Sequence, residues 1–132
     1  MDTAARIVSG TKIYGRDDTA VTALDDITVE FEAGHFTAIM GPSGSGKSTL
    51  LHCIAGLDAL TSGAAYIGET ELGSLKDKDL TILRRTQVGF IFQAFNLVPT
   101  LDAEENIVLP MTIAGTKPDR DWFVLVVSTV RI

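Results

Sequence analysis

One stretch of eight residues predicts more about the fold than any other part of the sequence: Gly41-Pro42-Ser43-Gly44-Ser45-Gly46-Lys47-Ser48. They match G-x-x-x-x-G-K-[ST], a loop that binds nucleotide phosphates. Its glycines let the backbone turn tightly and bring N–H groups close to phosphate oxygens. In such a loop Lys47 supplies a positive charge to the β and γ phosphates, and Ser48 offers a hydroxyl to Mg²⁺. The sequence therefore predicts a phosphate-binding site here.

The flanking residues fit this interpretation. Residues 36–40 form a short apolar run that ends at Gly41, which predicts a strand. The stretch from Lys47 to about Leu57 is helical in character, and its N-terminus would point a positive dipole at the phosphates. A strand, a glycine loop and a helix in this order distinguish the site from a Gly-Ser linker that contains Lys-Ser by chance.

The remaining pattern predicts a mixed domain. Residues 5–14 and 21–31 read as strands, with a shorter one at 65–67 and an apolar one at 88–92. Residues 75–85 have helical spacing, and residues 121–132 fit either a helix or a strand. The order of these elements indicates an α/β or α+β fold.

A further helix is predicted to start after Asp102. Glu105 stands three positions on and completes a capping box. Pro110 should interrupt or kink this helix, because it lacks an N–H and its ring clashes with the preceding turn.

Composition sets further bounds. A chain of 132 residues, with 45% hydrophobic and 21% charged residues, fits one globular domain. Its net charge of −6 argues against general nucleic-acid binding. The single cysteine, Cys53, excludes an intrachain disulfide and is expected to be a small buried hydrophobe in a reducing compartment. With no signal-peptide pattern and no apolar run of about 18 residues, we expect a soluble, cytoplasmic protein.

Several ordered motifs resemble the ATP-binding subunit of ABC transporters. The loop through Thr49 has the form which that family favours, and Tyr14 sits where the family places an aromatic that stacks on adenine. Residues 88–93 resemble the strand leading into the Q-loop, with Gln93 as its glutamine. Residues 92–101 look most like the subgroup that serves macrolide export and lipoprotein release.

The resemblance implies an α/β P-loop NTPase fold of the ABC ATPase type. It implies an incomplete form: an N-terminal antiparallel β subdomain, part of the parallel core and the start of the helical subdomain. We expect one truncated domain over residues 1–132, with the β subdomain and P-loop core at about 1–93 and the Q-loop and helical start at about 94–132. The family's Leu-Ser-Gly-Gly-Gln signature, and its apolar strand ending in Asp-Glu, do not occur in the sequence.

The resemblance also assigns a site. Lys47 and Gln93 would act in catalysis, and Ser48 and Gln93 would contact Mg²⁺. ATP would be held by Tyr14, Gly41, Pro42, Ser43, Gly44, Ser45, Gly46, Lys47, Ser48 and Thr49. The implied partners are the membrane subunits of a transporter and a second copy of the full-length subunit, on the inner face of the membrane. Because the catalytic acids are missing, we expect weak Mg-ATP binding and no hydrolysis.

Other interpretations remain open. The chain could be a non-catalytic half-domain that binds nucleotide or a partner through the Q-loop region. It could be another phosphate-loop enzyme, such as a GTPase or small-molecule kinase, although the guanine-reading Asn-Lys-x-Asp is absent. Without the family, Tyr14 would be a packing aromatic and Gln93 a polar residue at a strand end.

Overall fold

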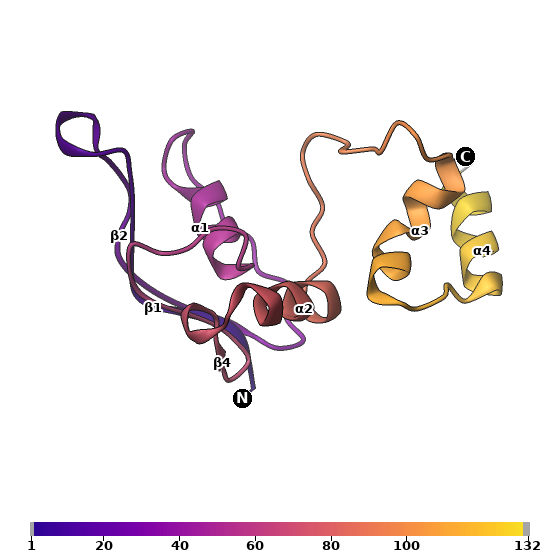
Figure 1. Ribbon diagram of the computed structural model, residues 1–132, viewed down its shortest axis with the longest axis horizontal. Coiled ribbons are helices and arrows are strands. Elements are labelled where there is room, and N and C mark those ends of the chain that lie inside the picture. Colours follow the sequence, from indigo (N-terminus) through magenta and orange to yellow (C-terminus); the bar gives the residue numbers. More distant parts are fainter. Residues whose placement is uncertain (1, 131–132) are drawn as a thin grey trace. The chain divides into compact units, whose positions relative to one another are not determined.

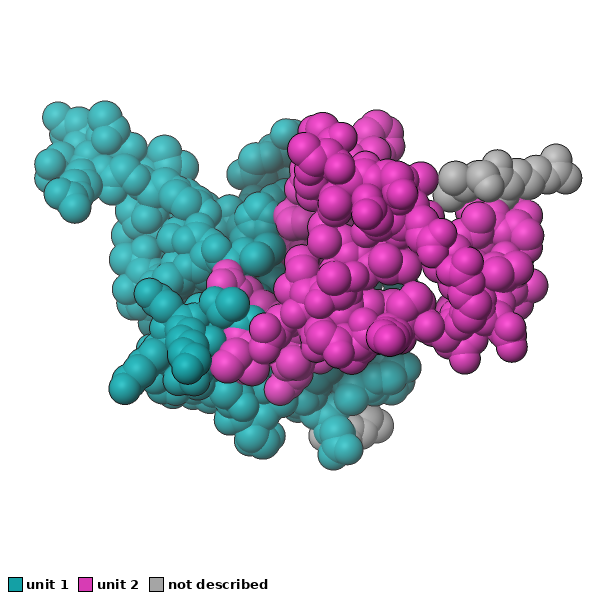
Figure 2. All heavy atoms as spheres, turned by 45° about the vertical axis from the view of Figure 1, so that its right-hand side comes forward, with its two compact units in different colours: residues 1–81 teal, residues 82–132 magenta. Residues whose placement is uncertain are grey.

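A computed structural model describes residues 2–130, and it divides into two compact units. Residues 1–81 form the first unit and residues 82–132 the second, as coloured in Figure 2. The chain path and element labels are shown in Figure 1.

The first unit is built on an antiparallel sheet of four strands in the order β2-β1-β3-β4. Residues 27–32 alternate between half-buried and exposed positions, as expected of a strand with one covered face. The predicted strands at 5–14, 21–31 and 65–67 are confirmed and are somewhat longer than expected. Their bounds are Thr3–Tyr14 for β1, Val21–Glu32 for β2, Ser62–Ile67 for β3 and Thr70–Glu71 for β4.

One position shows how closely the strands approach. β1 pairs with both β2 and β3, and each ladder contains register shifts. At the start of β3, Gly63 has a φ of +83°, and a Cβ there would overlap the backbone carbonyl of Ser9. A side chain is excluded at this crossing, so the glycine is required by contact as well as by conformation.

One helix covers the sheet. α1 spans Lys47–Ile54 and contacts β1, β2 and β3. Cys53 is 1% exposed and Ile7 of β1 is fully buried, so the helix and the central strand contribute the most buried side chains. Burial of Cys53 raises the pKa of its thiol, as expected for a structural cysteine. Two short 3₁₀ turns complete the unit, η1 at Asp17–Thr19 and η2 at Leu72–Ser74.

The remaining elements are helices. α2 spans Asp77–Gln87 and crosses from the first unit into the second. α3 spans Ala103–Ala114 and α4 spans Arg120–Val130. Residues 121–130, which fitted a helix or a strand, are therefore helical. An ion pair of 2.8 Å between Arg120 Nη1 and Glu104 Oε1 joins α4 to α3.

The predicted start of α3 is confirmed. The Glu105 backbone N–H donates to Asp102 Oδ1 at 2.8 Å, and the Asp102 N–H donates to Glu105 Oε2 at 2.8 Å. Of the two outcomes predicted for Pro110, interruption of the helix does not occur, because α3 continues through this residue. The cost is one missing hydrogen bond, since Pro110 has no N–H to donate to the carbonyl of Asn106.

Two predicted strands do not form. Residues 36–40 and 88–92 are irregular, and Phe36 and Ile91 are each 98% exposed. An apolar run becomes a strand only when a neighbouring strand satisfies its backbone N–H and C=O groups. Among residues 2–130, all sheet pairing occurs within β1–β4, so these two runs have no such neighbour.

Within residues 2–130, no helix is both long and apolar enough to cross a membrane.

Candidate functional site

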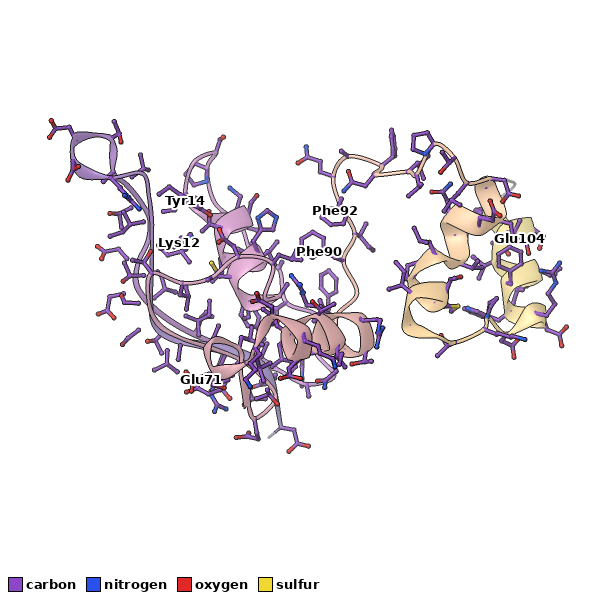
Figure 3. All side chains as sticks on the ribbon, in the orientation of Figure 1. Lys12, Tyr14, Glu71, Phe90, Phe92 and Glu104 are labelled. Carbon is purple, nitrogen blue, oxygen red and sulfur yellow. The ribbon has the colours of Figure 1, made fainter. Side chains whose placement is uncertain are left out.

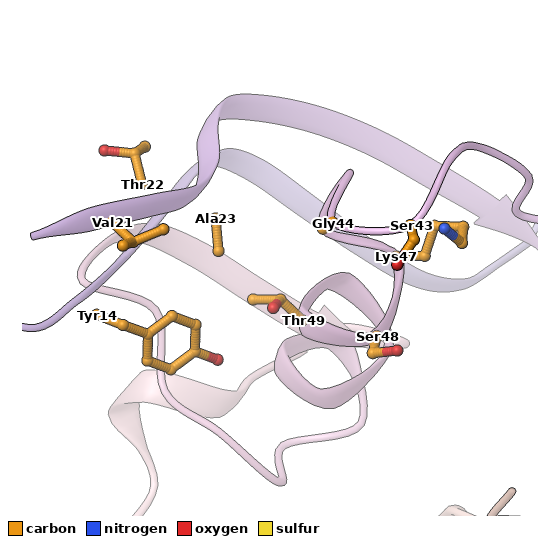
Figure 4. A pocket seen from close by; sticks show the side chains of 10 residues that line it. Tyr14, Val21, Thr22, Ala23, Ser43, Gly44, Lys47, Ser48 and Thr49 are labelled. Atoms are coloured by element: carbon orange, nitrogen blue, oxygen red, sulfur yellow. The ribbon is translucent and has the colours of Figure 1, made fainter.

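The first unit contains a cavity of about 370 Å³ beside the N-terminus of α1. Three segments supply its lining: the end of β1, the start of β2 and the glycine loop with the first turn of α1. In Figure 4, Tyr14 and Lys47 lie toward opposite ends of the lining, with Thr49 between them. The lining residues are Tyr14, Val21, Thr22, Ala23, Ser43, Gly44, Gly46, Lys47, Ser48 and Thr49.

Strand pairing brings the first two segments together. Tyr14 is the last residue of β1, Val21 is the first of β2, and the two are directly paired in the ladder. The turn between them contains η1. Packing of α1 against β1 and β2 then places the glycine loop beside this end of the sheet.

Gly46 sets the position of the loop against the sheet. It is the residue before α1, with a left-handed φ of 92°, and its carbonyl accepts the Leu50 N–H at 2.8 Å. A Cβ at Gly46 would overlap the carbonyl oxygen of Ala23 in β2. Since glycine carries no capping side chain, the first N–H groups of α1 are open to an anion.

Lys47 bonds within the loop itself. Its Nζ donates to the Pro42 carbonyl at 2.7 Å and lies 3.3 Å from Ser45 Oγ. The Ser45 hydroxyl donates to the same carbonyl at 2.7 Å. These contacts are side-chain bonds at an exposed site, so an anionic ligand can compete for the ammonium group without unfolding the loop.

Tyr14 is held by a small polar network. Its hydroxyl donates to Asp58 Oδ2 at 2.8 Å. Lys12 Nζ bonds Asp58 Oδ1 at 2.7 Å and the Ala59 carbonyl at 2.7 Å. The Lys12 ammonium also lies over the Tyr14 ring, 4.9 Å from its centroid.

This network shifts three pKa values. The hydrogen bond from Lys12 lowers the pKa of Asp58 below its ordinary value, and the Tyr14 hydroxyl adds to the effect. The same Asp58 carboxylate raises the pKa of Lys12 and that of Tyr14. Asp58 is therefore a carboxylate, Lys12 an ammonium and Tyr14 a neutral phenol at neutral pH.

The structure brings most of the predicted binding residues together. Seven of them line the cavity: Tyr14, Ser43, Gly44, Gly46, Lys47, Ser48 and Thr49. Gly41, Pro42 and Ser45 belong to the same loop but are not among the lining residues. Gln93 belongs to the second unit, at a bend after residues 88–92, and its role stays a prediction.

Sequence reasoning missed the wall formed by residues 21–23. Their alternation indicated a strand, but only the pairing of Val21 with Tyr14 shows that the strand begins beside the site. The contribution of Asp58 was missed as well, because 44 positions separate it from Tyr14. Among residues 2–130, no group of three or more His, Cys, Asp or Glu side chains could hold a metal ion.

The comparison with known families agrees with this geometry. The sequence pattern of the ABC transporter family matches residues 24–132, which is most of the chain. This chain belongs to the ABC transporter family.

Similar proteins include the ATP-binding protein MJ0796 of Methanocaldococcus jannaschii, which is 46% identical over 101 residues. The lipoprotein-releasing system ATP-binding protein LolD of Blochmanniella floridana is 45% identical over 106 residues. The macrolide export ATP-binding/permease protein MacB of Bdellovibrio bacteriovorus is 46% identical over 100 residues. These similarities confirm the predicted resemblance to macrolide-export and lipoprotein-release proteins.

Each match covers most of this chain but a smaller share of the related protein. The matches include 76–80% of this chain, but only 43% of MJ0796, 45% of LolD and 15% of MacB. The matched segments therefore span less than half the length of these relatives.

The fold comparison gives the same result. A dimeric structure of the MJ0796 cassette bound to ADP and Pi matches with a TM-score of 0.80 and 39% identity. The match covers 89% of this chain and 51% of that one. The predicted ABC ATPase fold is confirmed for the part of the domain that this chain covers.

Proposed function

We propose that this chain binds Mg-ATP in the cavity between Tyr14 and the glycine loop, as the nucleotide-binding part of an ABC transporter subunit. The observation that carries the proposal is a single cavity lined by both the phosphate loop and an aromatic ring. A nucleotide needs those two kinds of surface a short distance apart.

The residues that line the cavity fit a nucleoside triphosphate. A cavity of about 370 Å³ falls within the range of small-molecule sites, roughly 300–1,000 Å³. The open N-terminus of α1 and the Lys47 ammonium would hold the phosphates. The absence of a side chain at Gly44 and Gly46 lets the loop backbone approach them. Tyr14 would hold the base.

Magnesium would be held through few protein groups. The Ser48 hydroxyl lines the cavity and would supply one ligand, while phosphate oxygens and water supply others. Gln93 is the second protein ligand in this proposal, and its support is the family motif rather than its position. When bound, Mg²⁺ neutralises charge on the phosphates.

We assign binding rather than turnover to these 132 residues. No run of four apolar residues in the sequence is followed by two acidic residues, the arrangement in which the family carries its catalytic Glu. We therefore expect weak Mg-ATP binding with negligible hydrolysis.

The relatives suggest the setting. Their names describe lipoprotein-releasing and macrolide-export systems, and the solved cassette is dimeric. By analogy, this sequence would act in a dimer of subunits bound to membrane subunits at the cytoplasmic face. A pull-down from membranes that recovers no transporter subunit would count against this setting.

Loss of Lys47 tests the binding proposal. Lys47→Ala removes the charge that faces the phosphates, so it should weaken Mg-ATP binding by roughly tenfold or more, as expected for a charge-assisted hydrogen bond. Isothermal titration calorimetry with the purified chain measures this directly. Lys117→Ala, at an exposed lysine in the turn between α3 and α4, provides a matched control and should leave the affinity unchanged.

Two results would contradict the proposal. Equal affinities of the unchanged chain and Lys47→Ala would show that the loop does not hold the phosphates. Sustained phosphate release by the unchanged chain, abolished in Lys47→Ala, would show that the chain hydrolyses ATP after all.

A further inference from the structure

The Lys12–Asp58–Tyr14 network lies next to the cavity, and the function proposed above gives Asp58 no role. Lys12 and Tyr14 project from the same end of β1 (Figure 3), whereas Asp58 follows α1. Asp58 is the hub, because its two oxygens bond Lys12 and Tyr14 separately. It also accepts the Ala59 N–H at 2.8 Å, which fixes its own side chain.

The network restricts Tyr14 in two ways. The bond to Asp58 fixes the hydroxyl end of the side chain. Lys12 covers one face of the ring, so a planar ligand can stack only on the other face. An otherwise half-exposed aromatic ring is thus held in one orientation before any ligand arrives.

The Lys12–Asp58 ion pair is partly shielded from solvent. The Lys12 side chain is 13% exposed and that of Asp58 is 32% exposed, so both ions are partly withdrawn from water. Lys12 bonds two acceptors, a carboxylate and a carbonyl, which makes the pair more directional than an isolated surface ion pair. Ordering a ring in advance lowers the entropy lost on binding.

We propose that Asp58 is a positioning residue for the nucleotide base, holding the Tyr14 ring through its hydroxyl while Lys12 closes the opposite face. The inference rests on the function proposed above. Its consequence is specific: Asp58 contributes to binding of the base and not to binding of the phosphates.

Two probes separate those contributions. ATP carries a base and three phosphates, whereas inorganic tripolyphosphate carries the phosphates alone. With Mg²⁺ present, Asp58→Asn should weaken ATP binding by roughly five- to tenfold, a part of what stacking a base on an aromatic ring provides. Tripolyphosphate affinity should not change. A mere loss of folding would weaken both probes together.

Variants of Tyr14 test whether Asp58 acts through the Tyr14 hydroxyl. Tyr14→Phe keeps the ring but removes the hydroxyl, so it should reproduce the selective loss seen in Asp58→Asn. Combining the two substitutions should add nothing further, because both break the same bond. Tyr14→Ala should cost more than either. Asp25→Asn removes the same charge from an exposed position of β2 and should alter neither affinity.

The outcomes distinguish the two proposals. If Lys47→Ala leaves tripolyphosphate binding intact, the proposed function fails. If Lys47→Ala weakens both probes while Asp58→Asn and Tyr14→Phe leave ATP binding unchanged, only the positioning role is overturned. Should Asp58→Asn fail to fold, Tyr14→Phe alone decides, since it leaves the Lys12–Asp58 ion pair in place.

Discussion

At the residue scale, Gly46 meets two separate demands. Its φ of 92° lies in the left-handed region, which strains any residue with a Cβ. A Cβ would also overlap the Ala23 carbonyl, so the loop would have to move away from β2. The glycine pattern in the sequence predicted a tight turn, but the contact with β2 is visible only in the fold.

Gly46→Ala should therefore destabilise the chain by about 2–3 kcal/mol, combining conformational strain with a steric clash. Gly34→Ala is the matched control, because Gly34 also has a positive φ of 74° but has nothing within 4 Å of its Cβ position. It should cost only about 1 kcal/mol. Urea unfolding measures both. Equal losses would mean that the Ala23 contact contributes nothing.

Residues of the site differ in how far the sequence predicted them. Lys47 and Ser48 follow from a local pattern, because one loop fixes their geometry. Tyr14 followed from family position. Asp58 and Thr22 could not be predicted, since their places depend on strand pairing and on the packing of α1. Long-range contacts of this kind leave no periodic trace in the sequence.

At the element scale, local sequence patterns predicted an element correctly where its hydrogen bonds join residues that are close together in the chain. The capping box of α3 was predicted correctly because its two hydrogen bonds join residues three positions apart. Residues 36–40 and 88–92 were predicted wrongly as strands, because strand formation depends on a neighbour that a local pattern cannot supply.

The capping box can be tested directly. Asp102→Ala leaves the Glu105 N–H without its acceptor and should cost about 1 kcal/mol of stability in α3. Asp102→Ser retains a capping oxygen and should lose much less. Hydrogen exchange of the α3 amides reads out the difference. If both variants exchange like the unchanged chain, the cap does not stabilise this helix.

At the scale of the whole molecule, the candidate cavity lies entirely within the first unit. In the proposed function, the antiparallel sheet, α1 and the glycine loop would therefore supply both the surface that contacts the phosphates and the one that contacts the base. Gln93, the one predicted site residue outside that loop and Tyr14, belongs to the second unit. We accordingly expect nucleotide binding to change hydrogen exchange mainly within residues 1–81.

The most direct test of the central claim is hydrogen exchange, followed by mass spectrometry, with and without Mg-ATP. We predict slower exchange in peptides that contain Tyr14, residues 21–23 and residues 43–49, and no such change in Lys47→Ala. Exchange that is unaltered by Mg-ATP, or slowed only outside these segments, would contradict the assignment of this cavity as the nucleotide site.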